Sequence, residues 1–487
     1  MRLRLESLKR KYRNLSPAAK ASVWYAICGI LQKAIGVVVV PLYTRIMDSS
    51  AYGTYTVFQS WFTMLYVFTS LGLANYVFNN GMLKYADDRD GFSSAMLGLS
   101  GVSTLIFTAS FLLFPKFWTD ALGLAAPLVF LIFARCLISP SYDFWAERLR
   151  YEFRYKGVVG LTLILTLAVP VASVPIINCA EDKASAALAC QVVIMCIVYA
   201  IPLFSILRKS CKLFNKEYWL YALKFNLPLI PSMFATLALQ QLNRVIISGA
   251  VGESQAAIYS VAFSVGSVTM FIYSALEQAY RPWFYQGMGA KGFRSTGVGA
   301  LLIVLVGCAC WLITLFSPEV MALFAPDEYQ GGVYAIAPIA ASTVLIMLYS
   351  ILITVEYYFE ETVPIPVVSI LIAIFNYIVS SLLVPIFGYI VASYVTLACY
   401  TLLVLGHVLL CHRAMTIHMK GDYPLSLTRL MALTCGCVVL ILASQLSFEW
   451  LWLRIGIAVA ALVLLCVYHK KVVQLFALLV GVEKNPK

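Results

Sequence analysis

The segment TGVGALLIVLVGCACWLITLF, residues 296–316, decides the fold. It contains no charged residue, and its apolar side chains do not alternate with polar ones as they would in a lipid-facing β-strand. Because an α-helix needs about 20 mainly apolar residues to cross the ~30 Å hydrocarbon core, this segment predicts a transmembrane helix. Thirteen more such segments lie near residues 20–42, 54–78, 92–114, 123–142, 158–178, 186–207, 225–248, 256–278, 333–355, 364–386, 390–411, 427–446 and 452–468.

The composition agrees with a chain that lies mostly within a membrane. Of its 487 residues, 61% are hydrophobic and 12% are charged, and the mean hydropathy is +0.86. These values are far from those of soluble domains. The segments between the predicted helices are at most roughly 20 residues long, too short for a soluble catalytic domain. The sequence therefore predicts an all-α polytopic membrane protein with about 14 transmembrane helices.

The basic residues predict the orientation of the chain. With the N-terminus in the cytoplasm, 28 of the 35 Lys and Arg residues fall in cytoplasmic segments, as the positive-inside rule requires. We therefore expect an inner (plasma) membrane protein with both termini in the cytoplasm and a basic, surface-lying lead-in at residues 1–19. The outer loops hold only Arg45, Lys116, Lys183 and Arg454. The excess of Lys and Arg in the cytoplasmic segments explains the net charge of +12 without a nucleic-acid partner.

The sequence contains no P-loop, no GxSxG and no HExxH motif. Most of its 13 cysteines lie within predicted helices, so they predict packing residues rather than a disulfide framework. The histidines His407, His412, His418 and His469 lie near cytoplasmic helix ends without metal-ligand spacing, and we expect them to be interfacial or solvated. We predict no enzymatic activity, no metal and no cofactor.

The second and eighth predicted helices are similar at an offset of 204 residues. The aligned pairs include Tyr55 and Tyr259, Thr56 and Ser260, Val57 and Val261, Ser60 and Ser264, Thr63 and Ser267, and Ser70 and Ser274. The alternative is chance similarity among helices rich in the same few residues. A parallel repeat predicts two six-helix lobes plus two extra C-terminal helices. Their bounds would be 20–222 and 223–411 for the lobes, and 412–487 for the last two helices with the cytoplasmic tail.

Both repeated helices carry a polar stripe. Gln59, Thr63 and Ser70 share one face of the second helix, and Ser264 and Ser267 share the matching face of the eighth. A polar stripe on a membrane helix must face protein or a water-filled cavity. Helix–helix packing through small hydroxylated residues is the alternative for each serine. Two stripes at matching places favour a central aqueous cleft.

Three basic residues, Lys33, Arg135 and Arg244, fall inside predicted membrane helices, and Gln240 and Asn243 share a face with Arg244. A charge at this depth costs about 2.5–3.5 kcal/mol, so each needs water or a partner. The alternative is that these side chains reach toward the membrane surface. We take Lys33, Arg135 and Arg244 as candidate cations of the cleft.

No acidic residue lies in the middle of a predicted helix. Glu356 is expected at a cytoplasmic helix end, in a solvated acidic loop. A cleft with embedded cations and no embedded anions attracts an anionic passenger, such as a lipid-linked diphosphate or a uronate sugar.

Two stretches resemble bacterial polysaccharide flippases of the Wzx type. The first is ILQKAIGVVVVPLYTRIMDSSAYGTYTVFQSW, residues 30–61. It matches their first helix ending in Pro, Thr-Arg pair, polar turn and Tyr-Gly-x-Tyr at Pro41, Thr44, Arg45, Tyr52, Gly53 and Tyr55. The second is KFNLPLIPSMFATLALQQLNRVIISGAVGESQAAIYSVAFSV, residues 224–265. Pro228, Pro231 and Arg244 match there, whereas Asn243 and Ala257 depart from the usual Asp and Gly.

This resemblance implies membership of the superfamily that also contains MATE exporters and lipid II flippases. It implies two lobes that alternate access around a cleft. The implied cargo is an oligosaccharide on a polyprenyl diphosphate of the undecaprenyl type, moved from the cytoplasmic to the outer leaflet for surface polysaccharide or lipopolysaccharide assembly. A polysaccharide polymerase and chain-length proteins are the implied protein partners.

Two other functions stay open from the residues alone: a MATE-type drug or metabolite cation antiporter, and a membrane-embedded enzyme of polysaccharide assembly. The antiporter predicts buried acids for cation coupling, and the enzyme predicts paired carboxylates or a large outer loop. The sequence leaves the sugar, the coupling ion and the oligomeric state open, and it favours the flippase.

Overall fold

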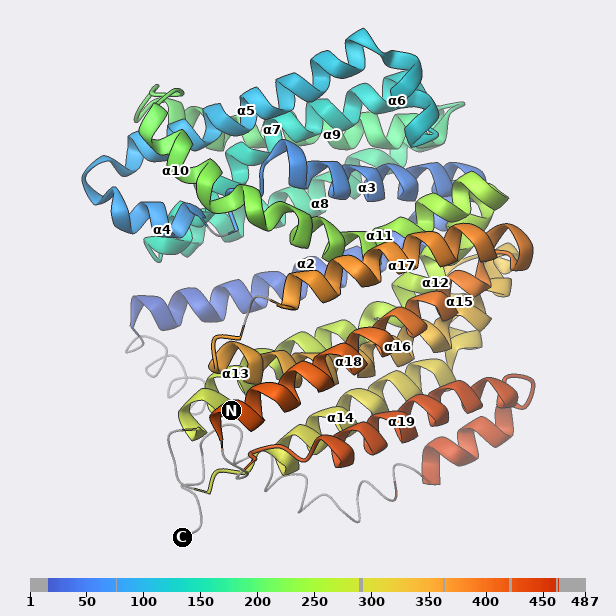
Figure 1. Cartoon of the computed structure of the whole chain (residues 1–487). Coiled ribbons are helices and arrows are strands. Elements are labelled where there is room, and N and C mark those ends of the chain that lie inside the picture. Colours follow the sequence, from blue (N-terminus) through green and yellow to red (C-terminus); the bar gives the residue numbers. More distant parts are fainter. Residues whose placement is uncertain are drawn as a thin grey trace, which may run out of the picture. The chain divides into compact units, whose positions relative to one another are not determined.

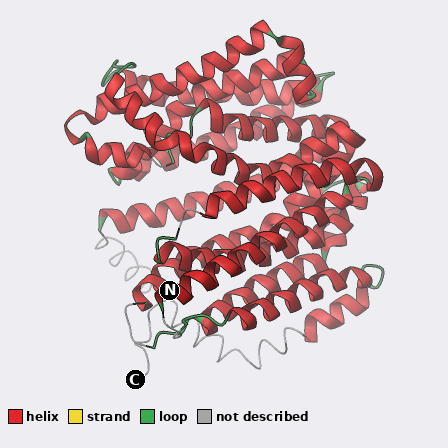
Figure 2. Ribbon diagram, in the orientation of Figure 1, coloured by secondary structure: helices red, strands yellow, loops and turns green. Residues whose placement is uncertain are grey.

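A computed structural model of the chain describes residues 16–75, 77–288, 292–361, 364–419, 423–460 and 463. Within these residues every regular element is a helix, and none is a strand (Figure 2). Twelve helical stretches are long and apolar enough to cross a membrane. The predicted all-α polytopic class is therefore confirmed. Residues 1–15 of the predicted lead-in and the predicted tail after residue 463 lie outside the described residues.

Two predicted membrane helices are not among these twelve. The second predicted helix is α3 (Ser49–Thr69), which has 21 residues but carries the Thr, Gln, Ser and Tyr side chains of the polar stripe. These residues lower its hydropathy without shortening it. The fourteenth begins as the short apolar helix Leu451–Ala460, and most of the rest of that prediction lies outside the described residues.

The chain divides into two compact units, Met1–Leu237 and Ala238–Lys487. In the first unit, α7 packs against α5 and α9, and α8 packs against α2 and α9 (Figure 1). Its helices are α2 (Pro17–Ile46), α3, α4 (Val77–Lys84), η1 (Ala86–Asp88), α5 (Arg89–Leu113), α6 (Pro115–Leu122), α7 (Ala126–Tyr151), α8 (Tyr155–Cys179), α9 (Lys183–Leu207), α10 (Lys216–Asn226) and η2 (Leu227–Leu229). Helix α11 (Ile230–Val251) contains the boundary between the units.

In the second unit, α16 packs against α14 and α18, and α18 packs against α17. Its helices are α12 (Glu253–Gly266), η3 (Ser267–Thr269), α13 (Met270–Gly287), α14 (Thr296–Leu315), α15 (Ser317–Phe324), η4 (Asp327–Gly332), α16 (Val333–Tyr358), α17 (Pro364–Phe387), α18 (Ile390–His418), α19 (Leu427–Ala443) and η5 (Ser444–Ser447). The pairs α14–α16, α16–α18 and α17–α18 follow the same order as α5–α7, α7–α9 and α8–α9. The two-lobe repeat with bounds at 20–222 and 223–411 stays a prediction.

Several helices continue beyond the ends that the apolar segments predict. Helix α7 runs to Tyr151 rather than to residue 142, and α18 runs to His418 rather than to residue 411. The added turns carry charged side chains that pair locally, such as Glu147 with Arg150. A helix predicted from hydropathy ends at the first charged residue, whereas the helical backbone in the structure continues beyond it.

Arg454, which the sequence analysis counts among the basic residues of the outer loops, is buried, with only 3% of it exposed. Its guanidinium donates to both carboxylate oxygens of Glu319 at 2.6 and 2.7 Å and to the Leu315 carbonyl at 3.1 Å. Burial alone would raise the pKa of Glu319, but the hydrogen bonds from Arg454 outweigh it and hold that pKa below its ordinary value. Arg454 therefore fastens Leu451–Ala460 to α14 and α15.

Replacing Arg454 with Ala should destabilise the second unit, because it leaves the Leu315 carbonyl and the Glu319 carboxylate without this donor. We expect a loss of about 1–3 kcal/mol, measured by thermal unfolding of the purified protein in detergent. The pair should stabilise the protein above the ordinary glutamate pKa of about 4.3. Its contribution should fade as the pH falls below that value through the lower folded-state pKa. An unchanged unfolding midpoint at pH 7 would contradict this role.

Candidate functional site

Arg135 lies on the wall of a cavity of about 400 Å³ in the first unit. The wall is formed by side chains of α2, α3, α7, α8 and α9. Its polar members besides Arg135 are Gln32, Tyr43, Tyr52, Tyr55, Thr166, Gln191 and Tyr199. The cavity therefore combines one guanidinium with amide and phenol groups inside the membrane-spanning part of the unit.

The Arg135 guanidinium is held from two sides. Its central carbon lies 3.6 Å from the centroid of the Phe62 ring, a cation–π contact. One of its terminal nitrogens donates to the Gln59 Oε1 at 2.6 Å, and Gln59 Nε2 donates to the Gln191 Oε1 at 2.7 Å. The buried Arg135 Nε has no hydrogen-bond partner among the described residues. The guanidinium is thus fixed in place with donor capacity to spare.

Helical periodicity brings the other cavity residues together. Gln191, Met195 and Tyr199 follow one another at four-residue intervals, which places them on one face of α9. The same interval on α2 separates two further lining residues, Val39 and Tyr43. This spacing was the available sequence signal for a lined cavity, although it also fits ordinary packing.

The second unit contains a similar arrangement around Arg244. Its guanidinium carbon lies 4.5 Å from the centroid of the Phe263 ring. A terminal nitrogen donates to the Gln241 Oε1 at 2.6 Å and to the Gln240 carbonyl at 3.3 Å. Each unit thus presents an arginine stacked on a phenylalanine ring and bonded to a glutamine side chain.

Gln240 and Ser267 line a cavity of about 240 Å³ in the second unit, together with Thr343, Thr396 and Tyr400. The structure thereby brings together two residues that the sequence predicted to line the cleft, Gln240 from the seventh predicted helix and Ser267 from the eighth. Most of the remaining wall is apolar. This cavity is therefore less polar than that of Arg135, and it is also smaller.

Asn243 is a buried structural residue, only 2% exposed. Its Nδ2 donates to the Thr396 Oγ1 at 2.7 Å and to the Ala392 carbonyl at 3.1 Å, and its Oδ1 accepts from the Ser380 Oγ at 3.1 Å. These bonds tie α11 to α17 and α18. Its position on the Arg244 helix made it a candidate, but its amide is occupied by the protein.

The hydroxyl groups of the two polar stripes form hydrogen bonds within their own helical segments. Thr63 and Ser70 line a separate cavity of about 330 Å³ in the first unit, yet their hydroxyls donate to the Gln59 and Tyr66 carbonyls of their own helix. Ser264 and Ser267 likewise donate to carbonyls within α12. Such bonds satisfy the hydroxyl proton without any ligand and leave only the oxygen as an acceptor.

Lys33 is exposed on α2, two residues before the cavity-lining Ile35. Among the described residues, Gln32 lines the Arg135 cavity, whereas the adjacent Lys33 does not. Space is open where a side chain at Gly29 or Gly36 would lie. The role of Lys33 as a cleft cation therefore stays a prediction.

The sequence interpretation missed one acid, Asp143, and misplaced another, Glu356. Asp143 lies on the wall of the 330 Å³ cavity and accepts a hydrogen bond from the Tyr66 hydroxyl at 2.5 Å. Glu356 is not solvated as predicted: it is 0% exposed and lies 2.9 Å from Nδ1 of His407, which is also 0% exposed. The expectation of an interfacial or solvated histidine was therefore wrong for His407. Both acids belong to the helical turns that extend beyond the predicted ends.

Two helical units with polar cavities at membrane depth define a polytopic membrane transporter. The chain belongs to the family described as "Polysaccharide biosynthesis protein", whose sequence profile matches residues 18–288. This membership confirms the Wzx-type resemblance seen in the sequence, and the family consists of transporters and flippases rather than enzymes. No curated protein matches the chain in sequence.

Solved structures with the same fold include a lipid II flippase, MurJ, in an inward closed conformation. It is 11% identical, with a TM-score of 0.60, and the match covers 92% of this chain and 100% of that one. A multidrug resistance MATE transporter of the MOP superfamily in an inward-facing conformation is 14% identical, with a TM-score of 0.59 over 83% and 100% of the two chains. An outward-facing MATE transporter of the same superfamily is 15% identical, with a TM-score of 0.52, and the match covers 84% of this chain and 98% of that one. At these identities the likeness establishes a MATE- and MurJ-like fold.

Proposed function

We propose that the protein is a flippase for a polyprenyl-diphosphate-linked oligosaccharide, which it moves from the cytoplasmic to the outer leaflet of the inner (plasma) membrane. Both termini lie in the cytoplasm in this proposal. The oligosaccharide would be a repeat unit of a surface polysaccharide, received next by a polymerase and chain-length proteins. Two lobes, predicted at residues 20–222 and 223–411, alternate access while the polyprenyl tail stays in lipid.

The observation that carries the proposal is the Arg135 cavity. The guanidinium on its wall, held in place by Gln59 and Phe62, attracts a phosphate oxygen, because charge-assisted hydrogen bonds to phosphate are strong. Phenol and amide groups around it match the hydroxyls of a sugar, and the Tyr rings offer apolar faces to its C–H groups. Membership of a polysaccharide biosynthesis family supports a glycan rather than another anion.

Asp143 supports a second candidate, a MATE-type cation antiporter. Asp143 on a cavity wall is the kind of intramembrane carboxylate that couples cation movement. Its partner is the Tyr66 hydroxyl rather than a second carboxylate, and the larger cavity carries a cation. These two features favour the flippase.

Reconstituted protein tests the choice directly. Liposomes would carry a fluorescent lipid-linked oligosaccharide in both leaflets, with a membrane-impermeant quencher added outside. We expect the full-length protein to raise the quenched fraction from the outer-leaflet share to nearly all of the lipid. Protein-free liposomes are the control. Organic-cation transport driven by an ion gradient, without any movement of the labelled lipid, would replace the flippase with the antiporter.

A further inference from the structure

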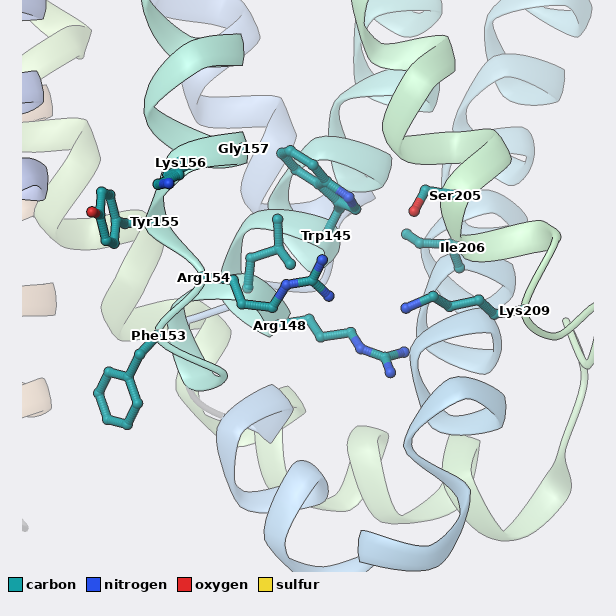
Figure 3. Close-up of a pocket in the computed structure, with 11 residues that line it drawn as sticks. Trp145, Arg148, Phe153, Arg154, Tyr155, Lys156, Gly157, Ser205, Ile206 and Lys209 are labelled. Carbon is teal, nitrogen blue, oxygen red and sulfur yellow. The ribbon is translucent and has the colours of Figure 1, made fainter. Parts of the chain in front are cut away.

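A pocket outside the Arg135 cavity lies at the ends of three helices of the first unit. It has a volume of about 580 Å³ and is bordered by the end of α7, the turn into α8 and the end of α9. Figure 3 shows Arg148, Arg154 and Lys209 reaching toward the same hollow from these three elements. The pocket is separate from the Arg135 cavity, with which it shares no lining residue.

Four basic side chains line this pocket, and two of them are offset by acids. Arg148 pairs with Asp90 and, at 3.1 Å, with Glu152, while Arg154 lies 3.5 Å from Glu152. Lys156 and Lys209 form no ion pair with any residue that the structure describes. The pocket therefore keeps the positive charge of these two lysines.

The backbone adds to this charge. Helix α8 begins at Tyr155, and its N-cap residue Arg154 makes no capping hydrogen bond through its side chain. The first residues of α8 line the pocket, so the positive end of the helix dipole lies at its edge.

The rest of the wall is apolar and aromatic. Trp145, Leu149, Phe153 and Ile206 contribute to it, and Phe153 is 52% exposed. Phe153 also has a φ of 55°, a left-handed conformation that is costly for an aromatic residue. Aromatic side chains beside basic ones at helix ends are typical of the membrane–water interface. A free anion in water would need the charges but not these apolar walls.

We propose that this pocket binds the phosphate headgroup of an anionic phospholipid in the cytoplasmic leaflet. The turn between α7 and α8 and the segment after α9 are the strongly basic segments that the positive-inside rule assigns to the cytoplasm. Basic pockets between helices on that side bind anionic headgroups. Lys209 on one side of the pocket and Lys156 on the other supply the positive charge that attracts the phosphate (Figure 3), while Trp145, Phe153 and Ile206 contact the glycerol and upper acyl chains. This lipid is a resident ligand, so the inference does not rest on the transport activity.

Native mass spectrometry of the purified full-length protein with phosphatidylglycerol measures this binding. In a Lys156→Ala, Lys209→Ala double variant we expect the apparent affinity to fall by about 25-fold, roughly fivefold for each lysine. The matched control is Arg208→Ala, Lys216→Ala, which removes two exposed cations of the same region that do not line the pocket. We expect the control to stay within about twofold of the native protein. Equal losses in the two double variants would overturn the site.

Two competitors identify the ligand. Phosphatidylcholine and inorganic phosphate should both leave the bound phosphatidylglycerol in place. Displacement by inorganic phosphate at the same concentration would show an ion site instead of a lipid site. Displacement by undecaprenyl diphosphate at far lower concentration would assign the pocket to the transported lipid and would also overturn the proposal. Both lysines are exposed, so unfolding midpoints measured without lipid should match among all variants.

Discussion

An Arg135→Ala variant should lose flippase activity by about 10- to 100-fold, the loss expected when one charge-assisted hydrogen bond of about 1.5–3 kcal/mol is removed. The guanidinium is the only cation among the described residues that line the 400 Å³ cavity. The variant leaves that cavity without positive charge, so an entering phosphate loses its ion partner. The rate of lipid movement in reconstituted liposomes measures the effect.

Two variants separate charge from geometry. Arg135→Lys keeps the charge but loses the planar stacking on Phe62 and the bond to Gln59, so we expect intermediate activity. Lys116→Ala removes an exposed cation on α6 and should leave activity unchanged. Full polymer production by an Arg135→Ala variant at normal abundance would falsify the role of this cation. If Lys33 and Arg244 share the role, the triple Ala variant should be the most impaired.

Glu356→Ala should be the most destabilising single substitution predicted here, by about 3 kcal/mol. Glu356 and His407 are both fully buried, and both Glu356 carboxylate oxygens lie within 3.0 Å of the same His407 nitrogen. The other ring nitrogen of His407 has no hydrogen-bond partner among the described residues. Removal of the carboxylate therefore leaves a buried imidazole without its partner between α16 and α18.

The chain contains a matched exposed pair for this experiment. His418 and Glu361 lie 3.4 Å apart, with 38% and 43% of their side chains exposed. Because exposed pairs contribute only about 0–1 kcal/mol, Glu361→Ala should barely change the unfolding midpoint in detergent. A similar small shift for both variants would show that the buried pair does not stabilise the second unit.

The class of fold was predictable because hydropathy is a local property. A run such as residues 296–316 must lie in a membrane whatever the rest of the chain does, and it forms α14. Arg135 and Arg244 were visible for the same reason, since a charge within an apolar run stands out. Both proved to stack on a phenylalanine ring within a structured polar setting.

The partners of these residues could not be predicted, because they depend on which helices meet. Gln59 bonds to Gln191, 132 positions away, and only the packing of α3 on α9 brings them together. Asn243 shares a helix with Arg244 yet faces α17 and α18, where its amide is occupied. Asp143 was overlooked and Glu356 was misplaced because a span judged from hydropathy ends where the first acid appears.

The burial of α16 has a consequence for the order in which the protein is built. This helix packs against α12, α13, α14, α18 and α19. In the stretch Asp327–Tyr358, which contains it, 89% of the residues in the most apolar 18-residue segment are buried. Three of these neighbours are synthesised before α16, but α18 and α19 follow it. The ribosome adds His407 51 residues after Glu356, so a nascent chain carries the carboxylate before its partner exists. The emerging helix must keep Glu356 at the membrane surface until α18 arrives, which makes α18 the segment whose insertion completes this buried pair.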